Sequence, residues 1–128
     1  MSIKPLTQAN FDEVVENNDM VVLDFWAEWC QPCKAFGKIY KEVAKEYPDI
    51  IFASINTDEE SQLASDFNIR SIPTLMILRQ RAVIFAQSGL LSASALRTLL
   101  DQAKTIDMTP VLEKLKAQET AKVDGDKK

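Results

Sequence analysis

Two apolar runs and one amphipathic segment dominate the first half of this 128-residue chain. The runs Val21–Trp26 and Ile50–Ile55 are almost continuously apolar, which is typical of strands buried on both faces of a sheet. Between them, the apolar positions from Cys33 to Tyr47 recur every three or four residues and predict an amphipathic helix that ends before Pro48. Strand, helix and strand in this order predict a right-handed parallel βαβ unit.

A helix is expected before this unit, and further elements are expected after it. Residues 8–17 predict the first helix, capped by Thr7 or a neighbour, and Asp58 is expected to cap a short helix. Residues 74–78 and 83–87 predict two strands that pair antiparallel. Their connection lacks the Asn-Gly pattern of a tight hairpin, so the register of this pair stays open.

The chain changes character after a last amphipathic helix, which Ser92 is expected to cap. Up to this point the elements predict an α/β domain over residues 1–106, with helices on both sides of a mixed sheet. Thr109-Pro110 is a good helix start, and the chain beyond Gln118 is rich in charge. We therefore interpret residues 107–128 as a C-terminal extension, a short helix followed by a disordered tail. A solvated helix is favoured over one that docks on a partner.

Composition and charge narrow the class of protein. The chain is 46% apolar and 27% charged, as in ordinary soluble domains, and its net charge of −4 argues against a nucleic-acid-binding surface. No apolar run approaches the roughly 18 residues of a membrane span, and the N-terminus lacks the pattern of a secretory signal. We therefore expect a cytoplasmic protein that binds neither nucleic acid nor membranes.

The two cysteines of the chain, Cys30 and Cys33, lie three positions apart in the segment Trp-Cys-Gln-Pro-Cys-Lys. A disulfide that closes so small a ring stabilises a fold by roughly 2 kcal/mol, so the pair is better suited to storing two electrons than to bracing the structure. The predicted helix places Cys30 at its first turn, where free N–H groups and the helix dipole favour a thiolate, and Pro32 fits that turn. We expect an exposed Cys30 to attack disulfides and a more buried Cys33 to resolve the mixed disulfide.

Three further features of the sequence are informative. Asp24 interrupts an apolar strand, so burial should raise its pKa and suit it to accept a proton from Cys33. An Asp24 that points to a loop in a purely structural role is an equal alternative. Trp29 would offer a flat apolar surface beside Cys30 if it is exposed, although a core tryptophan is the default. The bond between Ile72 and Pro73 precedes a strand, and about 5–6% of such X–Pro bonds are cis.

Two segments of the chain resemble the thioredoxin family. One is Val22–Lys34, which carries the Cys-Gln-Pro-Cys motif, and the other is Ile69–Thr74, followed at family-like spacing by Gly89 and a closing helix. The resemblance covers about residues 3–106. It implies the thioredoxin fold, which is a mixed central sheet with helices on both faces and a cis-proline loop beside the dithiol.

The resemblance also implies roles for individual residues. It makes Cys30 the attacking cysteine, Cys33 the resolving cysteine and Asp24 the buried carboxylate that aids proton transfer. Substrate chains are then expected to bind in a groove formed by Trp29, Gln31, Pro32, Ile72, cis Pro73, Ser88 and Gly89.

Four features depart from the family pattern. Gln31 stands where glycine is usual, between cysteines whose neighbours tune the redox potential. Ser54 replaces a lysine that pairs with the buried aspartate in many members, so the pKa of Asp24 should be higher still. Lys38 replaces a proline that kinks the long helix, and residues 107–128 have no counterpart in the minimal family.

The dithiol and the resemblance to thioredoxins together imply a monomeric protein-disulfide reductase that contributes to cell redox homeostasis. A thioredoxin reductase or similar donor would reopen its disulfide, and no bound cofactor or metal is expected, because Cys30 and Cys33 supply only half of a four-ligand zinc site and the chain has no histidine. Two alternatives stay open: a partner-binding module in which redox turnover is incidental, and a more oxidising thiol oxidase or isomerase.

Overall fold

The computed structural model describes residues 3–116, and a five-stranded sheet forms its centre. The strand order is β1-β3-β2-β4-β5, with β3 parallel to β1 and β2, and with β4 antiparallel to β2 and β5. The strands are β1 (Lys4–Pro5), β2 (Met20–Trp26), β3 (Ile51–Asn56), β4 (Thr74–Arg79) and β5 (Ala82–Ser88). The predicted mixed sheet and its βαβ unit are confirmed, whereas β1 was missed because two exposed residues carry no readable pattern.

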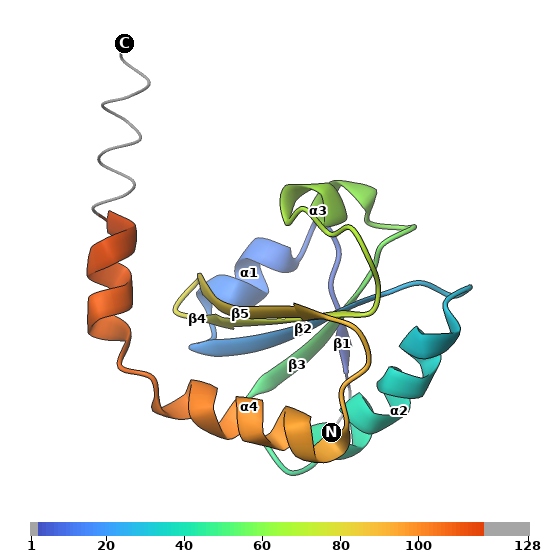
Figure 1. Cartoon of the computed structure of the whole chain (residues 1–128). Helices are drawn as coiled ribbons and strands as arrows, with labels where there is room; N and C mark the ends of the chain where they lie inside the picture. The colour runs from blue at the N-terminus through green and yellow to red at the C-terminus, as the bar shows by residue number, and fades with distance from the viewer. Residues whose placement is uncertain (1–2, 117–128) are drawn as a thin grey trace.

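Four helices cover the two faces of this sheet (Figure 1). The side chains of β2 alternate between the faces: Val21, Leu23 and Phe25 pack in one buried cluster, while Met20 and Val22 pack in the other. The first cluster includes residues of α1 and α3, and the second includes residues of α2 and α4. By the same alternation Asp24 lies on the α2 face. The helices are α1 (Phe11–Glu16), α2 (Gln31–Ala44), α3 (Ser61–Asp66) and α4 (Ala93–Thr105).

Tyr40 fixes α2 to the sheet. Its side chain is 1% exposed, and its hydroxyl lies 3.0 Å from the Val22 carbonyl oxygen and 2.8 Å from that of Ala53. These two carbonyls belong to the neighbouring strands β2 and β3. A single buried hydroxyl therefore holds the helix in register with both central strands.

Several element boundaries differ from the sequence prediction. α2 begins at Gln31 and ends at Ala44, three residues earlier than expected, because Tyr47 donates its N–H to Ala44 in a tighter closing turn. The helix is continuous through Lys38. The first helix begins only at Phe11, after a turn over residues 8–10.

The predicted cap of the short helix α3 is wrong. Glu60 occupies the N-cap position and makes no side-chain cap hydrogen bond, so Asp58 does not cap the helix. The carboxylate of Asp58 instead accepts a hydrogen bond from the Trp29 side chain. Ser92, by contrast, caps α4 as predicted, since its hydroxyl accepts a hydrogen bond from the Ala95 N–H.

β4 and β5 are joined by a tight two-residue turn, although the sequence carries no glycine there. Arg79 pairs with Ala82, and the two residues between them, Gln80 and Arg81, both have positive φ, at 50° and 68°. This is the backbone of a hairpin turn that normally favours Asn-Gly. Both residues therefore have a left-handed backbone conformation, which is energetically unfavourable for residues other than glycine.

The chain beyond α4 is tied to the domain. Residues 108–116 are helical, and Met108 is buried with 5% exposure. One nitrogen of the Arg79 guanidinium donates hydrogen bonds to the carbonyl oxygens of Ala103, at 3.1 Å, and Ile106, at 2.9 Å. The predicted short helix is present, whereas the tail predicted to be disordered lies outside the described residues.

Candidate active site

The dithiol occupies the start of α2. Cys30 is the N-cap residue, and its Sγ accepts a hydrogen bond from the Cys33 N–H at 3.2 Å. Pro32 lies in the first turn, where the helix needs no N–H donor. The two cysteines form a disulfide with Cα atoms 5.2 Å apart, so the sequence motif closes into a two-electron redox pair.

Cys30 is not the exposed residue that the sequence suggested. Its exposed fraction is 4%, almost the same as the 3% of Cys33. Both cysteines pack with Ala27, and Trp26 and Ile72 cover the cluster. The Sγ atom of Cys30 lies 3.8 Å from the Ile72 carbonyl oxygen. The cover therefore comes from a segment far along the chain, which local sequence patterns do not reveal.

That segment is the loop before β4, which holds the predicted cis peptide bond between Ile72 and Pro73. The Thr74 hydroxyl donates a hydrogen bond to the Ser71 carbonyl oxygen at 2.6 Å and so closes the loop on itself. The Pro73 carbonyl oxygen accepts a hydrogen bond from the Gly89 N–H at 2.8 Å. Gly89 has φ of 103°, a conformation that side chains rarely adopt.

These bonds bring together the three segments that the sequence singled out. The start of α2 with Gln31 and Pro32, the loop at Ile72 and Pro73, and the turn at Ser88 and Gly89 meet around one disulfide. Gln31, Pro32, Ser88 and Gly89 are exposed, and Pro73 is buried.

Trp29 forms one wall beside the disulfide. Its side chain is 68% exposed, so the default of a core tryptophan is wrong here. Its indole N–H donates a hydrogen bond to the Asp58 carboxylate at 3.0 Å, which orients the ring. Between Trp29 and Ile72 lies a hollow of about 380 Å3, which Arg70 also lines. Neither the contact of Asp58 with Trp29 nor the place of Arg70 in this hollow has a local signal in the sequence.

Asp24 lies inside β2 and not at a loop. The residue is 4% exposed, and within residues 3–116 its Oδ1 atom has no hydrogen-bond partner. Burial raises the pKa of this carboxyl from 3.8 to about 7. Asp24 and Cys33 line the same pocket of about 420 Å3, together with Ser54, which pairs with Asp24 in the strand register. The sequence prediction of a raised pKa is confirmed.

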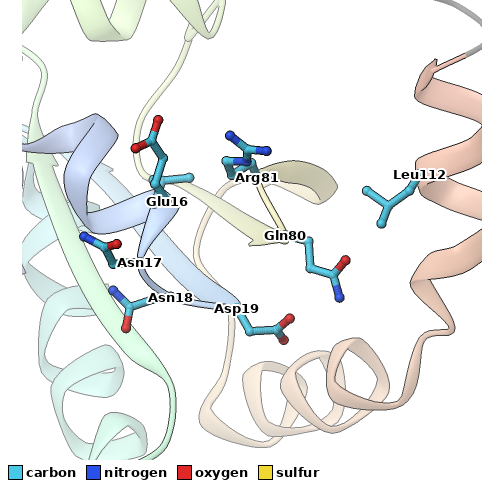
Figure 2. A pocket seen from close by; sticks show the side chains of 8 residues that line it. Glu16, Asn17, Asn18, Asp19, Gln80, Arg81 and Leu112 are labelled. Atoms are coloured by element: carbon cyan, nitrogen blue, oxygen red, sulfur yellow. The ribbon is translucent and has the colours of Figure 1, made fainter.

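A larger pocket lies at the other end of the sheet (Figure 2). It has a volume of about 700 Å3 and is lined by Glu16, Asp19, Gln80, Arg81 and Leu112, among others. No thiol lines it. The length of β4 separates it from the cis-proline loop, because the pocket lies next to Arg79 at one end of the strand and the loop leads into Thr74 at the other. In the part of the chain that the structure describes, no group of three or more histidine, cysteine or acidic residues could hold a metal ion.

Comparisons with known proteins agree with this geometry. The family model described as Thioredoxin matches residues 2–102. The chain belongs to the thioredoxin family. A relative from Streptomyces coelicolor is 45% identical over 114 residues, which cover 89% of this chain and 85% of the relative.

Solved structures of thioredoxins share the fold. A thioredoxin from Plasmodium falciparum aligns with a TM-score of 0.73 and 35% identity over 78% of this chain and 98% of that chain. Thioredoxin f from spinach chloroplast aligns with a TM-score of 0.74 and 30% identity, over 80% of this chain and 94% of that chain. This protein therefore has the thioredoxin fold and is a thiol-disulfide oxidoreductase. Residues 3–116 contain no helix that is long and apolar enough to cross a membrane.

Proposed function

We propose that this thioredoxin-family protein reduces disulfides of target proteins, with Cys30 as the attacking residue, Cys33 as the resolving residue and Asp24 as the proton acceptor. The proposal rests on one observation: the Cys33 N–H, in the first turn of α2, donates a hydrogen bond to Cys30 Sγ. In the reduced protein the same N–H, together with the dipole of the helix, favours a thiolate on Cys30. A thiolate is the form that attacks disulfides.

The reaction proceeds in two displacements. The Cys30 thiolate attacks one sulfur of the target disulfide, so a mixed disulfide forms and the other target sulfur leaves as a thiolate. Cys33 then loses its proton and attacks Cys30 Sγ, which releases the second target sulfur. The target gains two electrons from the dithiol, and its two thiolates take up two protons from solvent, which balance those that Cys30 and Cys33 have lost. Cys30 and Cys33 end as the disulfide seen here.

Asp24 is proposed to take the proton that Cys33 loses. Both line the same pocket, and a carboxyl with a pKa of about 7 is ionised in roughly half of the molecules at neutral pH. A general base works best when its pKa lies near the working pH. Protonation of Asp24 also removes the cost of its buried charge, so the proton transfer relieves an unfavourable feature of the resting site.

Trp29, Gln31, Pro32, Ile72, Pro73, Ser88 and Gly89 are proposed as the surface that receives the target chain. Further expectations from the sequence stay predictions: a monomer in the cytoplasm, a thioredoxin reductase or similar electron donor, no bound cofactor, and a division between residues 1–106 and the extension 107–128. Reduction is favoured over oxidation because the chain has no histidine between its cysteines. An equilibrium titration against glutathione decides the direction, since a potential above that of glutathione would make the protein an oxidant.

Reduction of insulin by dithiothreitol tests the assignment of the two cysteines. Cys30→Ser should abolish the catalysis, because it removes the attacking sulfur. Cys33→Ser should also stop turnover and, when the reduced variant is mixed with insulin without dithiothreitol, should accumulate a mixed disulfide that non-reducing electrophoresis detects. Equal activity of Cys30→Ser and the wild type, or a mixed disulfide that forms through Cys33 instead, would overturn the assignment.

A further inference from the structure

The hollow beside the disulfide contains one charged side chain that has no partner. Its lining consists of Trp29, Thr57, Ile69, Arg70, Ser71 and Ile72, and we call it the Arg70 niche. Arg70 is exposed, and no described residue forms a hydrogen bond or an ion pair with its guanidinium. The niche lies between Trp29 and Ile72, the residue whose carbonyl oxygen contacts Cys30 Sγ. A target chain bound over Cys30 therefore passes this arginine.

The polar side chains of the niche differ in whether they already form hydrogen bonds within the described structure. The Thr57 hydroxyl donates its proton to the Trp26 carbonyl oxygen at 3.2 Å. The Ser71 hydroxyl, like Arg70, has no hydrogen-bond partner among the described residues. None of the six lining residues carries a carboxylate or a side-chain amide. The niche thus offers unused hydrogen-bond donors and a positive charge between apolar walls.

A carboxylate is the group that complements this set. A guanidinium can bind a carboxylate through two parallel hydrogen bonds, and the walls formed by Trp29 and Ile72 reduce the screening of that pair by water. The Trp29 ring is itself held in place by Asp58, so the wall is formed before a target binds. An apolar residue would also fit the walls but would leave the guanidinium without a partner.

We infer that Arg70 is a specificity-determining residue that selects target disulfides flanked by acidic side chains. The inference rests on the proposed function, since it concerns the targets of Cys30. It assigns Arg70 no part in the displacement steps. Its effect is on the rate of the first attack, because the ion pair forms as the target docks.

The test uses peptide disulfide dimers in which both sulfurs are equivalent. Three dimers carry Glu, Gln or Lys on both sides of the cysteine, as in Gly-Glu-Cys-Glu-Gly, and the release of peptide thiol from reduced protein is followed by quenched flow and chromatography. The Glu dimer should react about two- to five-fold faster with the wild type than with Arg70→Gln. This is the range expected from the contribution of an exposed ion pair. The difference should disappear at about 1 M salt.

Arg81→Gln is the matched control. Arg81 is also exposed, but it lines the pocket at the other end of the sheet (Figure 2), and either substitution changes the net charge from −4 to −5. The ratio of the Glu rate to the Gln rate should fall in Arg70→Gln, stay at the wild-type value in Arg81→Gln, and be retained in Arg70→Lys. Each variant's rate is compared with its own Gln-dimer rate, so intrinsic peptide reactivity cancels.

Two results would overturn the inference. One is an unchanged ratio in Arg70→Gln, and the other is an equal fall in Arg81→Gln, which would show that only net charge matters. Either result with normal reaction of the Gln dimer leaves the proposed reductase function intact. If no dimer reacts with the wild type, it is the proposed function that fails.

Discussion

Replacing Asp24 by asparagine should stabilise this protein at alkaline pH and change how its stability depends on pH. Asp24 is a buried carboxyl whose Oδ1 atom has no hydrogen-bond partner among residues 3–116. An ionised carboxylate in such a place is unfavourable, which is why burial raises its pKa from 3.8 to about 7. Asparagine keeps the shape of the side chain and removes the charge.

Proton linkage gives the sign and the size of the change in the free energy of unfolding with pH. Between these two pKa values the folded protein holds a proton on Asp24 that the unfolded chain has lost, so stability falls as the pH rises from about 4 through 7 and then levels off. The full cost of the charge is about 4 kcal/mol, and about 2.5 kcal/mol of it develops between pH 5 and pH 8. Any fixed cost of burying the asparagine amide is the same at both pH values.

Urea unfolding of the oxidised protein at pH 5 and pH 8 measures this effect. The stability gained by Asp24→Asn should be larger at pH 8 than at pH 5 by about 2.5 kcal/mol. Asp12→Asn is the control, since it makes the same chemical change at an exposed carboxyl on α1 and leaves Asp24 in place. A stability difference between wild type and Asp24→Asn that is equal at both pH values would refute the assignment of the raised pKa to Asp24.

Substitutions at three further places, the β4–β5 turn, Tyr40 and Ser92, test the fold by the same unfolding assay. The double change Gln80→Asn and Arg81→Gly should stabilise by about 1 kcal/mol, because it suits the positive φ of both positions; a loss would argue against this turn. Tyr40→Phe should destabilise by about 1 kcal/mol through loss of the buried hydroxyl, and an unchanged midpoint would contradict that role. Ser92→Ala should cost about 1 kcal/mol and Ser92→Gly only a few tenths, whereas equal losses would argue against a cap.

The parts of the fold that could be predicted are those fixed by local pattern. The run Val21–Trp26 alternates between two buried faces, so its apolar character indicates a central strand whatever its neighbours are. The three-and-four spacing after Cys33 likewise reflects one buried helix face. Because a strand must lead directly into this helix, the position of Cys30 at its start follows from the sequence alone.

The parts that were missed depend on residues far apart in the chain. The cover over Cys30 comes from Ile72, forty-two positions later, so the burial of that sulfur has no local signal. The contact between Trp29 and Asp58 spans twenty-nine positions, and it draws Asp58 away from the capping role that its place in the sequence suggested. The hairpin turn has no signal in the sequence, because Gln80 and Arg81 adopt positive φ, which is unfavourable for both residues. The pairing of the flanking strands imposes this conformation.

Asp24 shows why a residue that weakens the fold is informative about function. Ser54, its register partner, offers no positive charge, and burial is what raises the pKa of the carboxyl to about 7. A neutral residue at this position would stabilise the fold at neutral pH, so stability alone does not explain an aspartate. The geometry offers an explanation, because Asp24 lines one pocket with Cys33 and can exchange its proton near neutral pH. If Asp24→Asn stabilises the protein and also slows the release of target from the mixed disulfide, the same buried charge accounts for both effects; if the release is as fast as in the wild type, the proton of Cys33 leaves by another route.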